Sequence, residues 1–422
     1  MNQDLLQQAA AGKLEETGAS KKLPIANKNN GNYKVYKIPL DELYYNDLNG
    51  RIATQFKQYE AENGAITPMK NSSSYNEVFQ DLVYNSDAKA LDETKKSIEN
   101  KSQQEPGVVL KDGRVLDGNR RFTAIRIWQQ ETNVQKFFEA VILDLDAQSD
   151  EKKIKELELE LQLGTEAKIG YDPIDRIFDV YNTIEVKKTM TAEEYRDFAG
   201  LAKINKVNND IEFAKLILDF IKIVSPGGNP IDKFYLARDL KLDGPIEEIG
   251  KTIADLKSKN KRAVTDAVLV NLVIAKTVNQ SKAPNLQIRD VKNSILSDAN
   301  NVKNYLNAYE KDDRIDDVVD YFKVNPIKSS NDLKIATEST DLKPILTTLN
   351  KSTERLVEKS KKATKRTKIL TNLDKIRDNL EDIHTSNFKS LTPDEFIESK
   401  EMIVEIKKTV NKLLYELGKS GE

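Results

Sequence analysis

The sequence predicts an α+β protein, in which a small mixed α/β domain near the N-terminus is followed by all-α helical domains. Strand-like segments and a glycine-centred hairpin are confined to residues 33–148. From residue 149 onward, apolar residues recur at helical spacing. A chain of 422 residues is also too long for one ordinary hydrophobic core, which favours two to four domains.

The first domain is predicted from alternation, turn residues and one hairpin. Lys111-Asp112-Gly113 separates two apolar runs, and Gly113 can adopt the positive φ that such a turn requires. In chain order, the predicted elements are a strand at 33–40, a helical turn at 41–43, an inserted polar stretch with some helix at 52–90, a helix at 92–100, a hairpin at 108–116, a helix at 121–130 and a strand at 138–145.

The remainder of the chain is divided by capping residues and one flexible-looking stretch. Asp172-Pro173 and Thr191–Glu194 have the residue types that begin helices. The stretch 225–230, rich in proline and glycine, is the best candidate for a linker. The predicted domains are a flexible tail at 1–32, an α/β domain at 33–148, helical domains at 149–225 and 226–340, and a C-terminal helical hairpin or bundle at 341–422.

Composition excludes several classes of site. The chain has no cysteine and a single histidine, so disulfides, thiolate metal sites and cysteine nucleophiles are excluded, and histidine-based catalysis is disfavoured. A net charge of -2 gives no global basic field, so any DNA contact must come from local patches. No apolar run approaches the roughly 18 residues of a membrane span, which predicts a cytoplasmic protein without a membrane partner.

The clearest candidate site is the loop Asp117-Gly118-Asn119-Arg120-Arg121, which lies between a predicted strand and a predicted helix. Gly118 permits a tight turn, and the first turn of the helix has unpaired amide donors at the positive end of the dipole. Arg120 and Arg121 add guanidinium groups that suit phosphate oxygens. The pattern predicts an anion site, although a plain turn with solvated or ion-paired arginines has the same spacing.

The order of motifs around this loop resembles the ParB/sulfiredoxin-like superfamily, in particular the ParB N-terminal domain, over residues 33–225. The resemblance rests on several short motifs in the family's order. The matching segments are Ile38-Pro39-Leu40-Asp41-Glu42-Leu43, Asn49-Gly50-Arg51, Glu105-Pro106-Gly107-Val108-Val109, Gly118-Asn119-Arg120-Arg121 with Ala124, Phe138–Leu143, Glu160-Leu161-Gln162 and Tyr171-Asp172-Pro173-Ile174.

The resemblance implies a nucleotide-binding domain, with CTP or another NTP as ligand and Mg²⁺ as the accompanying ion. Gly118, Asn119, Arg120 and Arg121 would lie at the phosphates, and Arg51 would approach the same pocket. The backbone of Pro106, Gly107 and Val108 would lie against the base. Glu160 or Gln162 would lie beside Mg²⁺, which prefers oxygen ligands.

Two departures from the family pattern bear on the chemistry. Asn119 stands where the family has a glutamate, which puts any role of that carboxylate in hydrolysis in question. Sulfiredoxin chemistry needs a cysteine in this loop, and the chain has none. Whether the protein is an enzyme stays open: NTP hydrolysis is compatible with the resemblance. A nuclease or small-molecule kinase would use Asp117 or Glu160 as acidic catalytic groups, and a non-catalytic interaction protein with a degenerate pocket is a third alternative.

Residues 191–216 resemble the helix-turn-helix that follows the nucleotide domain in ParB proteins. Lys203, Asn205, Lys206 and Asn208 open the second helix and could contact DNA phosphates and base edges. A structural helical hairpin with a solvated polar face explains the same residues. The basic stretch 351–368 likewise suits either a phosphate backbone or solvent.

The sequence therefore predicts a ParB-like, DNA-associated protein in which nucleotide binding switches conformation or assembly. The resemblance places such a protein in plasmid or phage maintenance. The apolar stripe of the last helix, Ile403, Ile406, Val410, Leu413 and Leu417, predicts a homo-oligomer that forms through the C-terminal helices.

Overall fold

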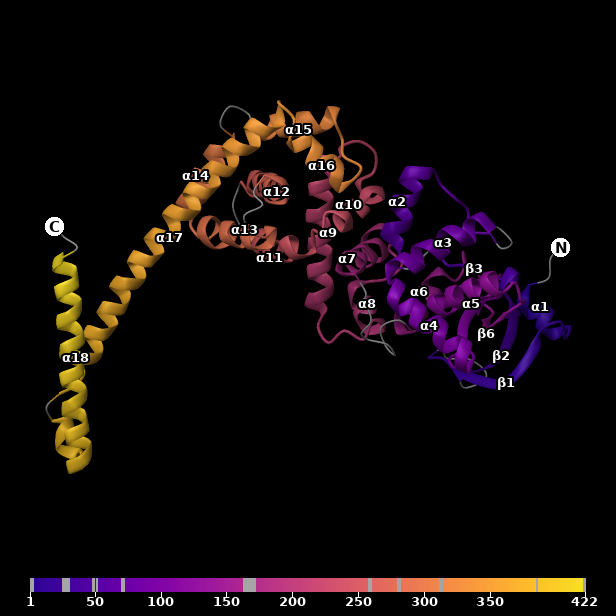
Figure 1. The fold of residues 1–422 in the computed structure, drawn as a ribbon, viewed down its shortest axis with the longest axis horizontal. Helices are drawn as coiled ribbons and strands as arrows, with labels where there is room; N and C mark the ends of the chain where they lie inside the picture. Colours follow the sequence, from indigo (N-terminus) through magenta and orange to yellow (C-terminus); the bar gives the residue numbers. More distant parts are fainter. Residues whose placement is uncertain are drawn as a thin grey trace. The chain divides into compact units, whose positions relative to one another are not determined.

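A computed structural model of the chain describes residues 4–24, 31–47, 50, 52–69, 73–161, 172–256, 260–278, 282–310, 314–384 and 386–419. It confirms the α+β class, since one mixed sheet near the N-terminus is followed by helices (Figure 1). The chain forms two compact units, Met1–Val357 and Glu358–Glu422.

The sheet has six strands in the spatial order β1-β2-β6-β4-β5-β3. The central strand β4 pairs in parallel with β6 and antiparallel with β5, and it is buried along its whole length. The strands are β1 (Glu15–Lys22), β2 (Asn32–Pro39), β3 (Tyr44–Tyr45), β4 (Gly107–Leu110), β5 (Arg114–Asp117) and β6 (Phe137–Leu143).

Each face of the sheet carries its own apolar cluster, because successive side chains of a strand point to opposite faces. On one face, Val109 and Val115 belong to a cluster with residues of the helices α1 to α5. On the other face, Val108 and Leu116 pack with α6. These helices are α1 (Leu5–Ala10), α2 (Ala53–Asn63), α3 (Ser73–Ser86), α4 (Ala88–Lys101), α5 (Asn119–Thr132) and α6 (Glu151–Leu159).

The prediction of a flexible tail at 1–32 is wrong for residues 5–10 and 15–22, which form α1 and β1. Strand β1 pairs antiparallel with β2, and Leu5, Leu14 and Leu23 are buried. The residues of β1 are mostly polar and exposed, so no alternation of apolar residues marks this strand in the sequence. Backbone pairing at the sheet edge and its flanking leucines hold it in place.

The helical part of the first unit is built around α9, whose second half is buried on nearly every side. Helices α7, α11, α12 and α15 pack against it (Figure 1). The helices are α7 (Pro173–Tyr181), α8 (Ala192–Phe198), α9 (Ile204–Val224), α10 (Tyr235–Asp239), α11 (Asp243–Asp255), α12 (Lys261–Thr277), α13 (Pro284–Val291), α14 (Ala299–Glu310), α15 (Arg314–Val324) and α16 (Ser330–Thr337).

The stretch 225–230, predicted as a linker, is a turn within one continuous core. Ser225 is buried, and its hydroxyl donates a hydrogen bond of 2.7 Å to the carbonyl of Ile327. The Ile327 amide in turn donates to the carbonyl of Val224. Because residues from Ile174 to Val357 share one apolar cluster, the boundary predicted at 225/226 does not separate two cores.

Two long helices, α17 (Leu342–Glu381) and α18 (Pro393–Lys419), end the described chain. The first part of α17 belongs to the first unit, because Leu342, Leu349 and Val357 are buried in its core. The second unit therefore begins at Glu358 and not at the predicted residue 341. Thr392 and Glu395 cap the start of α18 reciprocally.

Apolar side chains remain exposed on both long helices of the second unit. Their exposed fractions include 50% for Leu373, 40% for Ile406 and 49% for Leu413. Self-association through these helices stays a prediction. Among the described helices, none combines the length and apolar composition that crossing a membrane requires.

Candidate anion pocket

The loop predicted from sequence has the geometry of an open helix start. Gly118 is the N-cap of α5 with φ +93, a left-handed conformation that favours glycine. Glycine has no side chain with which to cap the helix, so the first-turn amides receive no cap from this position. A Cβ on Gly118 would lie 3.1 Å from Nη2 of Arg121 and 3.2 Å from its Nε. The glycine thus lets the Arg121 guanidinium fold back against the loop.

A second glycine, Gly107 at the start of β4, allows the strands beside the loop to pack closely. A Cβ on Gly107 would lie 2.3 Å from Cζ of Phe138 and 2.9 Å from the carbonyl oxygen of Asp117. The Phe138 ring is fully buried and packs against Phe122 of α5, with 5.6 Å between ring centroids. Only glycine at 107 lets β4, β5 and β6 approach this closely, which sets the position of Asp117.

Two cations converge on one oxygen of Asp117. Nη2 of Arg121 lies 3.1 Å from Oδ2 of Asp117, and Nζ of Lys21 lies 3.4 Å from the same atom. Lys21 also donates a hydrogen bond of 2.5 Å to the carbonyl of Pro106. In addition, Nε of Arg121 is buried without a hydrogen-bond partner among the described residues. The carboxylate therefore neutralises only part of the local positive charge.

These groups line a pocket of about 450 Å³ between the sheet and the helices that follow it. The pocket brings together three residues that the sequence singles out, Asp117, Arg121 and Glu160. Its lining residues are Lys21, Lys22, Pro24, Asp117, Arg121, Glu160, Leu161, Asp197, Phe198 and Gly200. Lys21 and Lys22 come from β1, Asp117 from β5 and Arg121 from α5. Glu160 and Asp197 come from the helical side, at the end of α6 and in α8.

Of the two predicted metal ligands, Glu160 is the one that lines this pocket. It follows the end of α6, and burial together with the nearby Glu156 raises the pKa of its carboxyl above the ordinary value. Across the described residues, no cluster of three or more histidine, cysteine, aspartate or glutamate side chains has metal-binding geometry. One carboxylate suits Mg²⁺ that is shared with phosphates, because that ion keeps several waters and takes few protein ligands. Gln162 and Arg51 lie outside the described residues.

The structure does not bring all predicted phosphate ligands into this pocket. Nη2 of Arg120 lies 3.8 Å from Oδ2 of Asp87, at the start of α4, and Arg120 is not among the described lining residues. Oδ1 of Asn119 is buried without a hydrogen-bond partner in the described part of the chain. Of the two arginines in the loop, Arg121 is the one that faces the pocket.

The predicted base contact at Pro106, Gly107 and Val108 has little open surface. Val108 lies between Asp117 of β5 and Val141 of β6 in the sheet, and its side chain is fully buried. The Pro106 carbonyl accepts the hydrogen bond from Lys21. Pairing within the sheet and the contact with Lys21 therefore leave little of these residues for a ligand to contact.

The second predicted element, α8 followed by α9, folds as a pair of packed helices. Thr191 and Glu194 form the predicted capping box at the start of α8. The two helices share one apolar cluster, which includes Phe198, Leu201, Ile204, Val207 and Ile211. Gly200 has φ +62 in the turn, and the Leu201 amide donates to the carbonyl of Arg196. The same turn supplies Asp197, Phe198 and Gly200 to the anion pocket.

The four predicted DNA-contacting residues, Lys203, Asn205, Lys206 and Asn208, are exposed at the start of α9. Asn205 and Asn208 also line a smaller pocket of about 260 Å³ with residues of α11, including Asp255. Helix α11 thus lies beside this face of α9. Asp210 does not face the same surface, since it is buried in a bidentate ion pair with Arg176.

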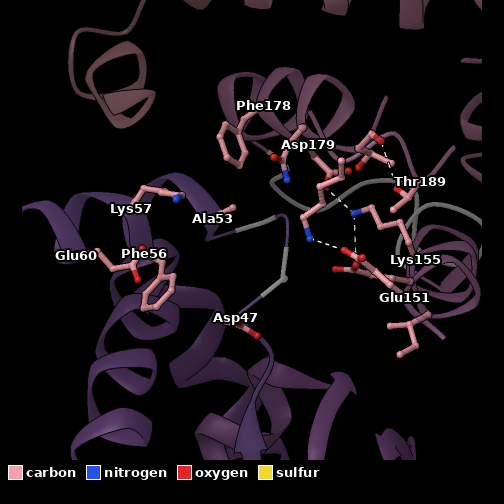
Figure 2. Close-up of a pocket in the computed structure, with 15 residues that line it drawn as sticks. Asp47, Ala53, Phe56, Lys57, Glu60, Glu151, Lys155, Phe178, Asp179 and Thr189 are labelled. Atoms are coloured by element: carbon pink, nitrogen blue, oxygen red, sulfur yellow. Dashed lines mark hydrogen bonds and ion pairs between the residues drawn. The ribbon is translucent and has the colours of Figure 1, made fainter. Parts of the chain in front are cut away.

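A third pocket, of about 300 Å³, lies between α2 and the helices α6 and α7 (Figure 2). Nζ of Lys155 lies 2.6 Å from Oδ1 of the buried Asp179 and 3.4 Å from Oε2 of the buried Glu158. The Tyr195 hydroxyl donates to the other Asp179 oxygen at 2.7 Å. Burial works against the charged ammonium of Lys155, but the two carboxylates outweigh it and raise its pKa. The charges of Lys155, Glu158 and Asp179 are therefore already paired with one another.

Asp175 of α7 connects α2 to the helical part of the first unit through buried polar contacts. Its side chain is fully buried, accepts a hydrogen bond from the Thr54 hydroxyl and lies 2.8 Å from Nη1 of Arg238. Burial raises the pKa of Asp175 to about 7, against the opposing effect of the Arg238 guanidinium. The contact joins α2, α7 and α10.

Sequence reasoning missed Lys21, Lys155, Asp175 and Asp179. Lys21 lies in a polar segment, and only strand pairing brings it to the pocket. Lys155, Asp175 and Asp179 lie in helices, and from the sequence alone charged residues in helices are expected to face solvent. A weak signal exists for Asp175, because it falls on the apolar face of α7 together with Ile174 and Phe178.

Comparisons with known proteins identify no family for this chain. No family profile matches the sequence, and no curated protein matches it. Among solved structures, a Pnob8-like ParB-N domain is similar at 13% sequence identity. That match covers 56% of this chain and 89% of the other, with a TM-score of 0.27. A TM-score this low does not establish a shared fold, so function is inferred from the geometry of the pocket.

Proposed function

We propose that the protein binds the polyphosphate of a nucleotide, together with Mg²⁺, in the pocket between β5, α5 and the α8–α9 turn. The observation that supports this most strongly is the shared lining of the pocket: Asp117 and Arg121 from the loop, Glu160 from the end of α6, and Gly200 from the turn. The nucleotide would act as a switch in a DNA-associated, ParB-like protein.

The sheet side of the pocket suits phosphate oxygens. Arg121 offers a planar guanidinium with N–H groups beyond those used on Asp117, and its Nε is buried without a partner among the described residues. Gly118 leaves the helix start free of a side-chain cap, so backbone amides and the helix dipole add to the attraction for an anion. A phosphate would satisfy donors that the described protein groups do not.

The helical side of the pocket suits the metal ion that accompanies a polyphosphate. Glu160 and Asp197 line it from α6 and α8. Mg²⁺ is commonly held by one or two carboxylates plus phosphate oxygens, and it neutralises part of the phosphate charge when bound. Glu160 would hold the ion, and Asp197 would add negative charge nearby.

A ligand in this pocket would touch both the sheet domain and the predicted helix-turn-helix. Phe198 and Gly200 belong to the end of α8 and the turn, while Lys203 and Lys206 lie exposed just beyond it on α9. Binding at one side of the turn would therefore bias the orientation of α9. We propose duplex DNA as the partner of the α9 start, through its lysines and asparagines.

The test is isothermal titration of the full chain with each of the four ribonucleoside triphosphates, with Mg²⁺, in the presence and absence of duplex DNA. CTP, which the family resemblance implies, is the first nucleotide to titrate. We expect Arg121→Ala to weaken binding by about 10- to 100-fold, because a hydrogen bond to a charged group contributes about 1.5–3 kcal/mol. Absence of binding to every nucleotide would refute the proposal.

The matched control is Arg126→Ala, which removes an arginine on the same helix whose Nε donates to Gln80 away from the pocket. Its affinity for the nucleotide should stay within about twofold of the wild type, since it loses no phosphate contact. Arg120→Ala separates the two arginines of the loop. A loss as large as that of Arg121→Ala would show that both arginines contact the phosphates, as the sequence predicts.

A further inference from the structure

Strand β1 carries Lys21 into a pocket whose other lining residues come mainly from the loop at Asp117, from α5 and from the helices that follow the sheet. Leu23, just after β1, is buried in the same cluster as Val108 and Leu116, which brings the end of β1 close to β4 and β5. Lys21 is only 18% exposed in its side chain, and its ammonium reaches the Pro106 carbonyl and Asp117. This lysine lies outside the segment, residues 33–225, on which the family resemblance rests.

The contacts of Lys21 leave it able to take an anion. An ammonium has three N–H groups, and the contacts with Pro106 and Asp117 use two of them within the described part of the chain. Asp117 shares one oxygen between Lys21 and Arg121, so the three side chains together carry a net charge of about +1 at neutral pH. The other charged lining residues, Lys22, Glu160 and Asp197, add -1, so the lining is positive on the sheet side, where phosphate would lie, and negative on the helical side.

We propose that Lys21 is a direct polyphosphate ligand, and that β1 is a functional part of the binding site as well as an edge strand. This inference rests on the proposed function and deepens it by naming a residue of the site. Lys21 of β1 and Arg121 of α5 would both contact the phosphates. Asp117 positions both cations between them by pairing with each.

A purely structural role for Lys21 makes different predictions. As a structural residue, it would hold β1 against Pro106 and Asp117, and its loss would lower stability without changing the salt dependence of anion binding. As a ligand, its loss would reduce the number of cations that neutralise phosphate charge. The dependence of log Kd on log salt would then become shallower, because fewer counterions are exchanged on binding.

The experiment uses the full chain, with inorganic tripolyphosphate plus Mg²⁺ and the four ribonucleoside triphosphates as probes, titrated at several salt concentrations. Lys21→Met keeps the apolar stem and removes the charge. We expect it to weaken binding by about tenfold, as the loss of one charge-assisted hydrogen bond does, and to make the salt dependence shallower. Lys21→Arg should retain affinity within about threefold, since the cation remains.

The control is Lys34→Met on β2, which removes an equally charged but exposed lysine that pairs with Glu16 outside the pocket. Its affinity should stay within about twofold of the wild type. If wild type binds and Arg121→Ala weakens binding by about 10- to 100-fold while Lys21→Met matches Lys34→Met, the role of Lys21 is refuted and the pocket stands. If wild type binds none of the probes, the proposed function and this inference fall together.

Discussion

Arg238→Met is expected to lower the free energy of unfolding by about 1–2 kcal/mol at pH 8, because the buried carboxyl of Asp175 loses its countercharge and must take up a proton instead. Asp175 is fully buried, and the Thr54 hydroxyl alone cannot balance a full negative charge. Methionine preserves much of the apolar stem, so lost packing contributes little. Chemical denaturation of the full chain measures the loss.

The same pair gives the stability a specific pH dependence. The pKa of Asp175 is about 7 in the folded protein, above its ordinary value of 3.8. The folded state therefore binds this proton more tightly than the unfolded state. Its stabilising contribution is complete below about pH 4 and is lost as the pH rises through about 7. The penalty of Arg238→Met should accordingly be smaller at pH 5 than at pH 8.

Asp175→Asn supplies the control for both effects. An asparagine does not titrate, so the part of the pH slope between about pH 4 and 7 that comes from Asp175 should be absent from this variant. The other carboxyl groups titrate in both the wild type and the variant, so their contributions cancel when one pH slope is subtracted from the other. Equal slopes for wild type and Asp175→Asn would show that Asp175 does not titrate in this range.

Gly107→Ala is expected to destabilise the protein by about 1–3 kcal/mol and to weaken nucleotide binding together with stability. The new methyl group would overlap the buried Phe138 ring at 2.3 Å and press on the Asp117 backbone at 2.9 Å. Relief requires β4 to move away from β5 or the ring to leave its place against Phe122. Either movement displaces Asp117 and, with it, Lys21 and Arg121.

Gly244→Ala is the matched control for this substitution. Its Cβ would meet the Cβ of Asn285 at 3.8 Å, an ordinary contact, in the first turn of α11. Alanine is a better helix former than glycine, but at the residue before Pro245 a Cβ disfavours the helical conformation, so stability should stay within about 1 kcal/mol of the wild type. Thermal unfolding and nucleotide titration of both variants test this prediction. Equal stability and equal nucleotide affinity of Gly107→Ala and Gly244→Ala would contradict the packing account.

The elements that sequence reasoning predicted well are those whose signal is local. The hairpin around Gly113 and the capping residues Asp172 and Thr191 act through their immediate neighbours, and the structure confirms each of them. The loop at 117–121 belongs with them, since a glycine between a strand and a helix defines its geometry within a few residues.

What the sequence did not predict depends on contacts between distant segments. Strand β1 is polar, and its place at the sheet edge follows from pairing with β2 and from Leu23. The turn at 225–230 looks flexible in sequence, but the Ser225–Ile327 contact fixes it across about a hundred residues. Arg120 and Arg121 are equivalent in a linear pattern, and only the helix geometry turns one to Asp87 and the other to Asp117.

The central claim, that one ligand joins the loop to the α8–α9 turn, is tested most directly by hydrogen–deuterium exchange of the full chain with and without Mg²⁺ and nucleotide. Amides at the start of α5, residues 119–122, and in the turn, residues 198–201, should both exchange more slowly when the ligand is present. Protection at neither segment, or at the start of α5 without the turn, would contradict the claim.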